Sequence, residues 1–153
     1  MIIEMDTRNQ KDEYVTNYLD EHGIKYIRNK LYAGDVKLID STKVIIDLKA
    51  NTLEIANNLC QSSQHARIKR EIERAREIGC ERFIFLIKDD EIRHTSDLIN
   101  WRNKRTQVKG VILMKVMATM KERYGCEFIY TTTNDAPRKI LELLGADNFD
   151  KTK

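Results

Sequence analysis

The chain of 153 residues is 41% apolar and 33% charged, which predicts one domain, residues 1–153, with a single sizeable core. Its net charge of +3 provides no overall basic field, so any surface that binds nucleic acid has to be local. No stretch has the length of a membrane span or the basic start of a signal peptide, which argues against a membrane protein and for a cytoplasmic one.

The cysteines and histidines indicate neither a disulfide framework nor a zinc site. Cys60, Cys80 and Cys126 are odd in number and far apart, which is typical of reduced, buried thiols. The three histidines do not show the spacing of zinc ligands.

Three elements are predicted before residue 30. They are a strand at residues 1–5, a helix at 10–21 that stops at Gly23, and a strand at 24–27. Asp6 and Arg8 follow the first strand directly, where charged and turn-forming residues replace the apolar ones. Glu13 lies off the apolar face of the helix, and the pattern gives it no role.

The strongest chemical signal lies in a predicted antiparallel hairpin with strands at residues 36–39 and 44–49. Side chains alternate along a strand, so Asp47 and Lys49 share one face. The pairing can bring Asp35, which opens the first strand, beside Asp47. Two acids and a lysine on one patch are the minimum needed to hold a divalent ion over a phosphodiester. An Asp-x-Lys that stood alone would more often be a salt-bridged strand end.

A helix is predicted at residues 62–78, with an arginine stripe beside its apolar seam. The stripe consists of Arg67, Arg70 and Arg74. Like charges one turn apart repel, and a phosphate backbone alongside would offset that repulsion. Gln64 lies near the helix start on the side of the apolar seam, where it could point into a cleft. A solvated amphipathic helix is the alternative interpretation.

The rest of the chain continues the alternation of strands and helices. We predict a strand at 83–87, a surface turn at 88–91, a short helix through residue 101 that Ser96 and Asp97 cap, a helix at 108–123, a strand at 127–130, a helix at 136–144 and a polar tail at about 147–153.

Residues 101–109 contain four basic residues, one aromatic residue and no acid. Basic side chains neutralise phosphates, and an indole can stack on an unpaired base. The segment is therefore a candidate contact for nucleic acid through Trp101, Arg102, Lys104 and Arg105. An ordinary exposed loop beside a core tryptophan is the competing interpretation.

The order of these motifs resembles the nuclease domain of the ERCC4 (XPF/Mus81) family, within the PD-(D/E)xK superfamily. The matching residues are Asp6 and Arg8, Gly34-Asp35, and Asp47-Leu48-Lys49. The resemblance runs through most of the chain. It implies an α/β, restriction-endonuclease-like fold in which helices flank a mixed central sheet.

The chain departs from the family pattern at three places. The family commonly has Glu-Arg-Lys where this chain has Asp47-Leu48-Lys49, and Arg-Glu where it has Arg8-Asn9. Aspartate can coordinate magnesium as glutamate does, whereas losing the middle arginine removes a phosphate contact. The acid that usually follows the lysine by four residues is displaced by one, to Glu54.

The resemblance implies a DNA endonuclease that uses Mg²⁺, for which Mn²⁺ can substitute. Asp35 and Asp47 would be side-chain ligands and the carbonyl of Leu48 a third ligand. The ion would polarise the phosphoryl oxygen and acidify the attacking water. Neighbouring carboxylates keep Lys49 protonated, so we assign it to orienting the water and stabilising the phosphate. Asp6 would ligate a second ion or hold Arg8.

The resemblance also suggests a biological setting. We expect cleavage of flap, fork or junction DNA in replication, repair or recombination, by a stand-alone phage or mobile-element version in a bacterial or phage-infected cytoplasm. Family members bind DNA with the help of additional domains or a second subunit, so a homodimer or a DNA-binding partner is expected. A restriction-type or junction-resolving enzyme would share this chemistry. The alternative from another class is a catalytically silent nuclease fold that binds DNA or protein.

Overall fold

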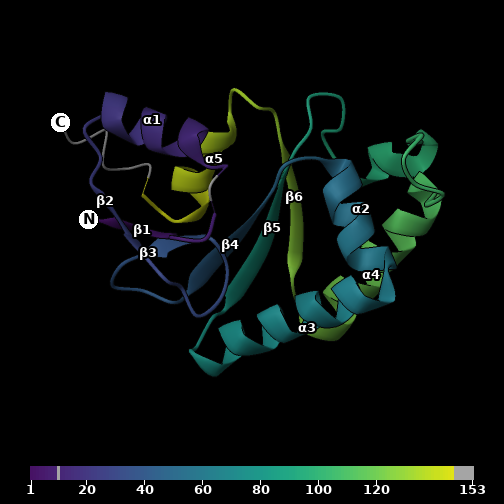
Figure 1. The fold of residues 1–153 in the computed structure, drawn as a ribbon, viewed down its shortest axis with the longest axis horizontal. Helices are drawn as coiled ribbons and strands as arrows, with labels where there is room; N and C mark the ends of the chain where they lie inside the picture. The colour runs from purple at the N-terminus through teal and green to yellow at the C-terminus, as the bar shows by residue number, and fades with distance from the viewer. Residues whose placement is uncertain (10, 147–153) are drawn as a thin grey trace.

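The computed structural model describes residues 1–9 and 11–146, and the predicted polar tail at 147–153 lies outside them. A six-stranded sheet in the order β2-β1-β3-β4-β5-β6 forms the centre (Figure 1). Its strands are β1 (Ile3–Asp6), β2 (Tyr26–Asn29), β3 (Val36–Leu38), β4 (Val44–Lys49), β5 (Arg82–Lys88) and β6 (Glu127–Thr131). β3 runs antiparallel to β1 and β4, and the other neighbours are parallel. The predicted mixed α/β sheet and its hairpin are confirmed.

Helices cover both faces of the sheet. They are α1 (Glu13–Glu21), α2 (Thr52–Cys60), α3 (Ser62–Glu77), the 3₁₀ helix η1 (Thr95–Asn100), α4 (Gly110–Tyr124) and α5 (Ala136–Leu143). Figure 1 shows α1 and α5 together over one face, with α2, α3 and α4 over the other. Within the described ranges, none of these helices combines the length and apolar character that a membrane crossing requires.

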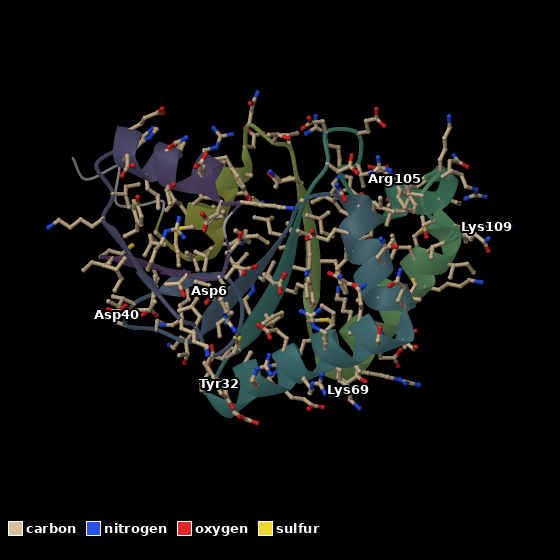
Figure 2. All side chains as sticks on the ribbon, viewed as in Figure 1. Asp6, Tyr32, Asp40, Lys69, Arg105 and Lys109 are labelled. Atoms are coloured by element: carbon tan, nitrogen blue, oxygen red, sulfur yellow. The ribbon has the colours of Figure 1, made fainter. Side chains whose placement is uncertain are left out.

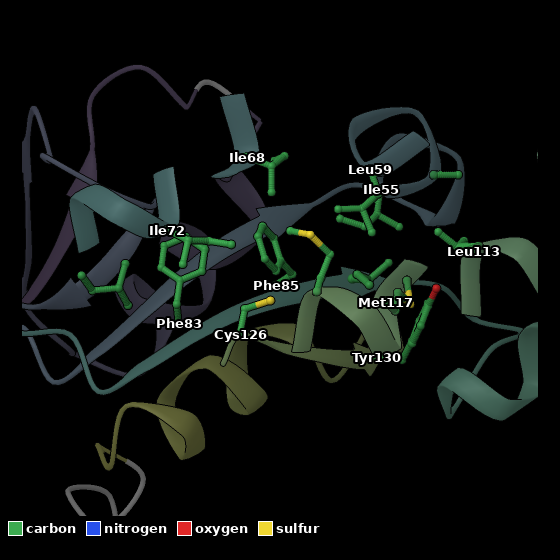
Figure 3. Packing of buried hydrophobic residues seen from close by; sticks show 14 of the residues in the cluster. Ile55, Leu59, Ile68, Ile72, Phe83, Phe85, Leu113, Met117, Cys126 and Tyr130 are labelled. Carbon is green, nitrogen blue, oxygen red and sulfur yellow. The ribbon is translucent and has the colours of Figure 1, made fainter. Parts of the chain in front are cut away.

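The alternation of side chains along β5 explains why both faces are covered. Phe83, Phe85 and Ile87 belong to the core under α2, α3 and α4, while Ile84 and Leu86 belong to the core under α1 and α5. All five are buried. Figure 3 shows Phe83 and Phe85 packed among side chains of the larger core. A strand buried on both faces has a continuous apolar sequence, as β5 has.

Helix α2 is the element that the sequence analysis missed. Asn51 caps it, since its side-chain oxygen accepts a hydrogen bond of 2.8 Å from the N–H of Glu54. Ile55, Ala56 and Leu59 form its buried face. The signals of a cap and an apolar face were both present in the sequence.

The short helix also differs from its prediction in type and in its cap. It is a 3₁₀ helix that begins at Thr95, so Ser96 lies inside it. The carboxylate of Asp97 instead accepts hydrogen bonds of 3.0 Å from the N–H groups of Arg93 and His94, which precede the helix.

Candidate active site

A cavity of about 840 Å³ opens where β1, β4 and β5 end, between α1 and α3. Asp6, Asp35, Asp47 and Lys49 line it together, so the structure brings the predicted acids and lysine to one place. They come from three strand ends, and Asp6 is separated from Asp47 by 41 positions of sequence. Figure 2 shows Asp6 near the middle of the molecule, beside the sheet.

Gly34 allows Asp35 to approach β4 closely. Its φ of +73° lies in the left-handed region, and a Cβ atom there would lie 2.3 Å from Cγ2 of Ile45. The N–H of Asp35 donates a hydrogen bond of 2.8 Å to the carbonyl oxygen of Ile46. The absence of a side chain at residue 34 therefore fixes the Asp35 backbone against the strand that carries Asp47.

Asp47 lies close enough to Asp35 to influence the protonation of Asp35. Burial, and then the charge of Asp47, raise the pKa of Asp35 to about 8, against the stabilising hydrogen bond of 2.7 Å that the Leu48 N–H donates to Asp35 Oδ2. Burial also raises the pKa of Asp47. Two carboxylates that resist joint ionisation form a site that gains free energy when a cation joins them.

Lys49 lies on the same face of β4 as Asp47, as predicted. Its Nζ atom is 3.0 Å from Asp47 Oδ1, and both side chains are 11% exposed. The contact lacks hydrogen-bond geometry, so Asp47 Oδ1 is a buried oxygen without a hydrogen-bond donor. Burial lowers the pKa of Lys49, but Asp47, Glu54 and Asp35 together outweigh it and the net shift is upward. Lys49 is therefore a cation at neutral pH and unsuited to act as a base.

The donor set fits a hard divalent cation. Within the described ranges, no group of three or more histidine, cysteine, aspartate or glutamate side chains is arranged to hold a metal ion. Mg²⁺ does not need such a group, because it binds through one or two carboxylates and retains several waters. Asp35 and Asp47 supply two carboxylates, and Oδ1 of Asp47 has a lone pair that no donor uses.

Asp6 holds Arg8, which was one of the two predicted roles for it. The carboxylate of Asp6 accepts hydrogen bonds from Arg8 Nε, at 3.0 and 3.2 Å, and from the Leu31 N–H at 2.9 Å. Arg8 Nη2 donates to the Leu31 carbonyl oxygen at 2.7 Å. The hydrogen bond to Asp6 raises the pKa of Arg8. With its guanidinium held at the cavity wall, Arg8 can face a phosphate.

Helix α3 forms the opposite wall, and the predicted stripe of Arg67, Arg70 and Arg74 faces the cavity together with Gln64. Sequence analysis missed Glu71, which lies on the same stripe. Its carboxylate pairs with Arg74 and accepts a hydrogen bond of 2.5 Å from the Gly34 N–H. Glu71 thus offsets the repulsion between the arginines and ties α3 to the turn that carries Asp35.

Four other residues clarify where the site ends. Glu54 lines the cavity and accepts a hydrogen bond of 3.2 Å from the Ala50 N–H, whereas Glu13 is exposed outside it. Tyr14 and Lys88 also line the cavity. They were not selected from the sequence, because Tyr14 fitted the apolar face of a helix and Lys88 a surface turn.

The basic segment 101–109 does not contribute to this cavity. Trp101 is half-buried against the larger core, while Arg102, Lys104 and Arg105 are exposed. Figure 2 shows Arg105 at the far end of the molecule from Asp6. Contact between this segment and DNA stays a prediction, separate from the cavity.

Comparisons with known proteins agree with the fold. The family model described as ERCC4 domain matches residues 5–144. The structure of XPF from Aeropyrum pernix is similar, with a TM-score of 0.69 and 18% identity over 98% of this chain and 68% of that one. The same protein in complex with DNA gives 0.68 and 19%, over 97% and 65%. No curated protein sequence matches. The chain thus shares the nuclease-domain fold of XPF, and by the extent of the family match it belongs to the ERCC4 domain family.

Proposed function

We propose that this chain is a DNA endonuclease that hydrolyses phosphodiester bonds with the help of Mg²⁺ or Mn²⁺. One observation carries the proposal: the carboxylates of Asp35 and Asp47 lie together with Lys49 at the base of a cavity whose wall bears three arginines. Membership of the ERCC4 domain family supports it. The complex of the similar XPF structure with DNA supports the choice of substrate.

Each residue of the site has a role that follows from its charge and position. Asp35, Asp47 and the carbonyl of Leu48 would hold the divalent cation. When bound, this cation supplies Lewis acidity at the phosphoryl oxygen and at a water. Lys49 orients that water and stabilises the negative charge that develops on the phosphate. Arg8, fixed by Asp6, offers a further cation to the same phosphate.

The arginines of α3 would bind the phosphates that flank the reacting one. Among them, Arg74 is already paired with Glu71. Within the described ranges, Arg67 and Arg70 have no carboxylate at ion-pair distance, so their full charge is available to a ligand. Because exposed charges attract DNA without regard to sequence, this wall supports recognition of DNA shape.

The finer substrate and setting extend the family resemblance to this chain. We propose flap, fork or junction DNA as substrate, in replication, repair or recombination. The chain spans 68% and 65% of the two XPF chains, so DNA contacts from a second copy or a DNA-binding partner form part of the proposal. The phage or mobile-element setting has no support from the comparisons and stays a prediction.

A cleavage assay tests the proposal. Labelled flap, fork, four-way and plain duplex DNA are incubated with the protein in Mg²⁺, Mn²⁺ or EDTA. We expect cleavage of at least one branched substrate with either metal, no cleavage in EDTA, and a loss of activity in Asp47→Ala. Activity that is unchanged in Asp47→Ala would end the catalytic assignment.

A second function, a silent nuclease fold that binds DNA or protein, is favoured by one observation. In the part of the chain that the structure describes, no group of three or more histidine, cysteine, aspartate or glutamate side chains is arranged to hold a metal ion, although five carboxylates line the cavity. Thermal melting in a titration of Mg²⁺ or Mn²⁺ distinguishes the two functions. A cation that binds only the folded state raises the melting temperature, whereas a silent scaffold would not respond.

A further inference from the structure

We propose that Lys88, held against the ring of Tyr14, binds a phosphate of the substrate strand on the side of the acids opposite to the α3 arginines. This inference rests on the proposed function. It adds that the substrate is a continuous strand with a phosphate on each side of the cleaved bond, and not a mononucleotide or a strand end.

The register of the sheet places Lys88 on the other face from the α3 wall. Asp47 lies beside Phe85, and Lys49 beside Ile87, in the parallel pairing of β4 with β5. Phe85 and Ile87 face the core under α2, α3 and α4. Because side chains alternate along a strand, Lys88 leaves β5 toward the face that α1 and α5 cover.

The cavity therefore continues from one face of the sheet to the other, past the carboxyl ends of β4 and β5. Lys88 lines the same cavity as Arg67 and Arg70, although α3 covers one face of the sheet and Lys88 projects toward the other. Asp35 and Asp47 line the same cavity, with Asp47 on the face of β4 that α3 covers, so Lys88 and the α3 arginines approach the acids from different directions. A polynucleotide strand that crosses this edge would place one phosphate over the acids and its neighbours on either wall.

Tyr14 holds Lys88 in place without neutralising it. Tyr14 comes from α1 and packs against the core under α1 and α5. The Lys88 ammonium lies 3.9 Å from the centroid of its ring, a cation–π contact that limits the motion of the side chain while its charge remains. A charge that is positioned before the ligand arrives costs less ordering entropy on binding.

Lys88 differs from three other cations of the cavity in its lack of an acid partner. Arg8, Lys49 and Arg74 each form an ion pair with a carboxylate. In residues 1–9 and 11–146, no carboxylate lies at ion-pair distance from Lys88. Its charge is thus available to an anion, and phosphate is the anion that the proposed substrate carries at regular intervals.

The test combines variants with neutralised phosphates, all in the Asp47→Asn background so that the DNA stays intact. The probe is a fluorescent branched DNA whose cleavage position has been mapped with wild-type protein, carrying a single uncharged methylphosphonate at successive positions around that bond. Lys88→Met removes the charge and keeps an apolar side chain on Tyr14, and Lys88→Arg retains the charge. Lys69→Met is the matched control, because Lys69 is an exposed lysine of α3 outside the cavity (Figure 2).

Fluorescence anisotropy then gives the dissociation constants. We expect Lys88→Met to weaken binding about three- to tenfold and to reduce the salt slope by about one, with Lys88→Arg close to wild type and Lys69→Met within about twofold. At one position of the DNA, the methylphosphonate should weaken binding by the protein that retains Lys88. The same methylphosphonate should not weaken binding by Lys88→Met any further. Arg70→Met should lose the effect of a methylphosphonate at a different position, on the other side of the cleaved bond.

Three outcomes would overturn the proposal. A Lys88→Met protein that folds and binds as well as Lys69→Met would exclude the phosphate contact. Coupling of Lys88 and Arg70 to the same side of the bond would exclude the path across the sheet edge. In both cases the nuclease function would stand as long as wild-type protein cuts DNA and the Asp47→Asn variant does not. Wild-type protein that neither binds nor cuts DNA would overturn both proposals.

Discussion

Two buried aspartates of this chain each lie beside a basic side chain, and the two pairs are built differently. Asp12, before α1, receives a two-pronged contact from Arg28 of β2, with Nη2 at 2.8 Å from Oδ1 and Nη1 at 3.0 Å from Oδ2. Asp47 has one contact with Lys49, leaves Oδ1 without a hydrogen-bond donor and adjoins a second acid. In the first pair both carboxylate oxygens accept a hydrogen bond, whereas in the second Oδ1 of Asp47 accepts none.

Under the proposed function, the difference separates a pair that stabilises the fold from a pair that serves chemistry. When every oxygen of a buried carboxylate accepts a hydrogen bond, the charge-assisted bidentate bonds offset the free-energy cost of desolvation. When one oxygen accepts no hydrogen bond and a second acid lies nearby, that cost is not offset. Matched Asp→Asn substitutions at the two pairs can test this comparison.

The largest effect is expected from Asp47→Asn. Cleavage should fall by at least about a thousandfold, which corresponds to about 4 kcal/mol of activation free energy. The melting temperature in metal-free buffer should equal or exceed that of wild type, because a neutral amide replaces a charge that burial disfavours. Cleavage rates and thermal melts of the same preparation check both statements. A lower melting temperature would show that this pair stabilises the fold after all.

Asp12→Asn should have the opposite signature. Replacing the carboxylate removes the charge-assisted bonds that join α1 to β2, and we expect a loss of about 1–2 kcal/mol of unfolding free energy, or about 3–6 °C in melting temperature. Cleavage below that temperature should stay within about tenfold of wild type, since Asp12 does not line the cavity. A loss of cleavage comparable to that of Asp47→Asn would contradict the comparison.

The pH dependence of stability sharpens the comparison further. Asp35 has an ordinary pKa of 3.8 in the unfolded chain and about 8 in the folded one. Between these values the folded state binds more protons, so this group's contribution to stability is full below pH 4 and is lost as the pH rises toward 8. Asp35→Asn retains an oxygen for the Leu48 N–H and removes this loss.

Without metal at pH 8, we therefore expect the unfolding free energy of Asp35→Asn to exceed that of wild type by on the order of 1–2 kcal/mol. Near pH 4 the two unfolding free energies should be similar. Asp40→Asn, at an exposed position of the β3–β4 turn, is the control and should follow wild type (Figure 2). With added Mg²⁺ at pH 8, wild type should become more stable than Asp35→Asn, because only wild type keeps both carboxylate ligands. Parallel melting curves for the two variants would contradict the raised pKa.

The smallest effect is expected at the basic segment 101–109, which lies apart from both pairs. Alanine at Arg102, Lys104 and Arg105 should weaken binding of a long duplex about two- to fivefold, through lost phosphate contacts. Binding of a short oligonucleotide that fills only the cavity should not change. Anisotropy at two salt concentrations checks this, and equal binding of the long duplex would exclude the predicted contact.

Much of the fold could be predicted because local patterns determine it. The alternation along β4 placed Asp47 and Lys49 on one face, and the antiparallel hairpin brought Asp35 beside them, so pairing between neighbouring strands was enough. The arginines of α3 followed from helical periodicity in the same way. These features depend on residues that are close in the sequence or one turn apart.

The residues that were missed depend on contacts between distant segments. Lys88 lines the cavity because β5 lies parallel to β4 and α1 covers the other face, and the residues around position 88 indicate neither fact. Glu71 faces the cavity, but its role comes from the Gly34 N–H, 37 positions away. The segment 101–109 shows the converse limit, because a basic composition indicates affinity for phosphate without indicating that the segment lies away from the cavity.

The bare backbone at residue 34 also constrains how this protein can change over evolutionary time. A single methyl group there would collide with Ile45 and push the Asp35 turn away from its neighbouring strand. If the proposed function holds, drift at that position would abolish hydrolysis while sparing most of the core. A descendant that keeps both acids but carries alanine at 34 is expected to have become a scaffold, so this one position offers a quick test for decayed copies in a genome.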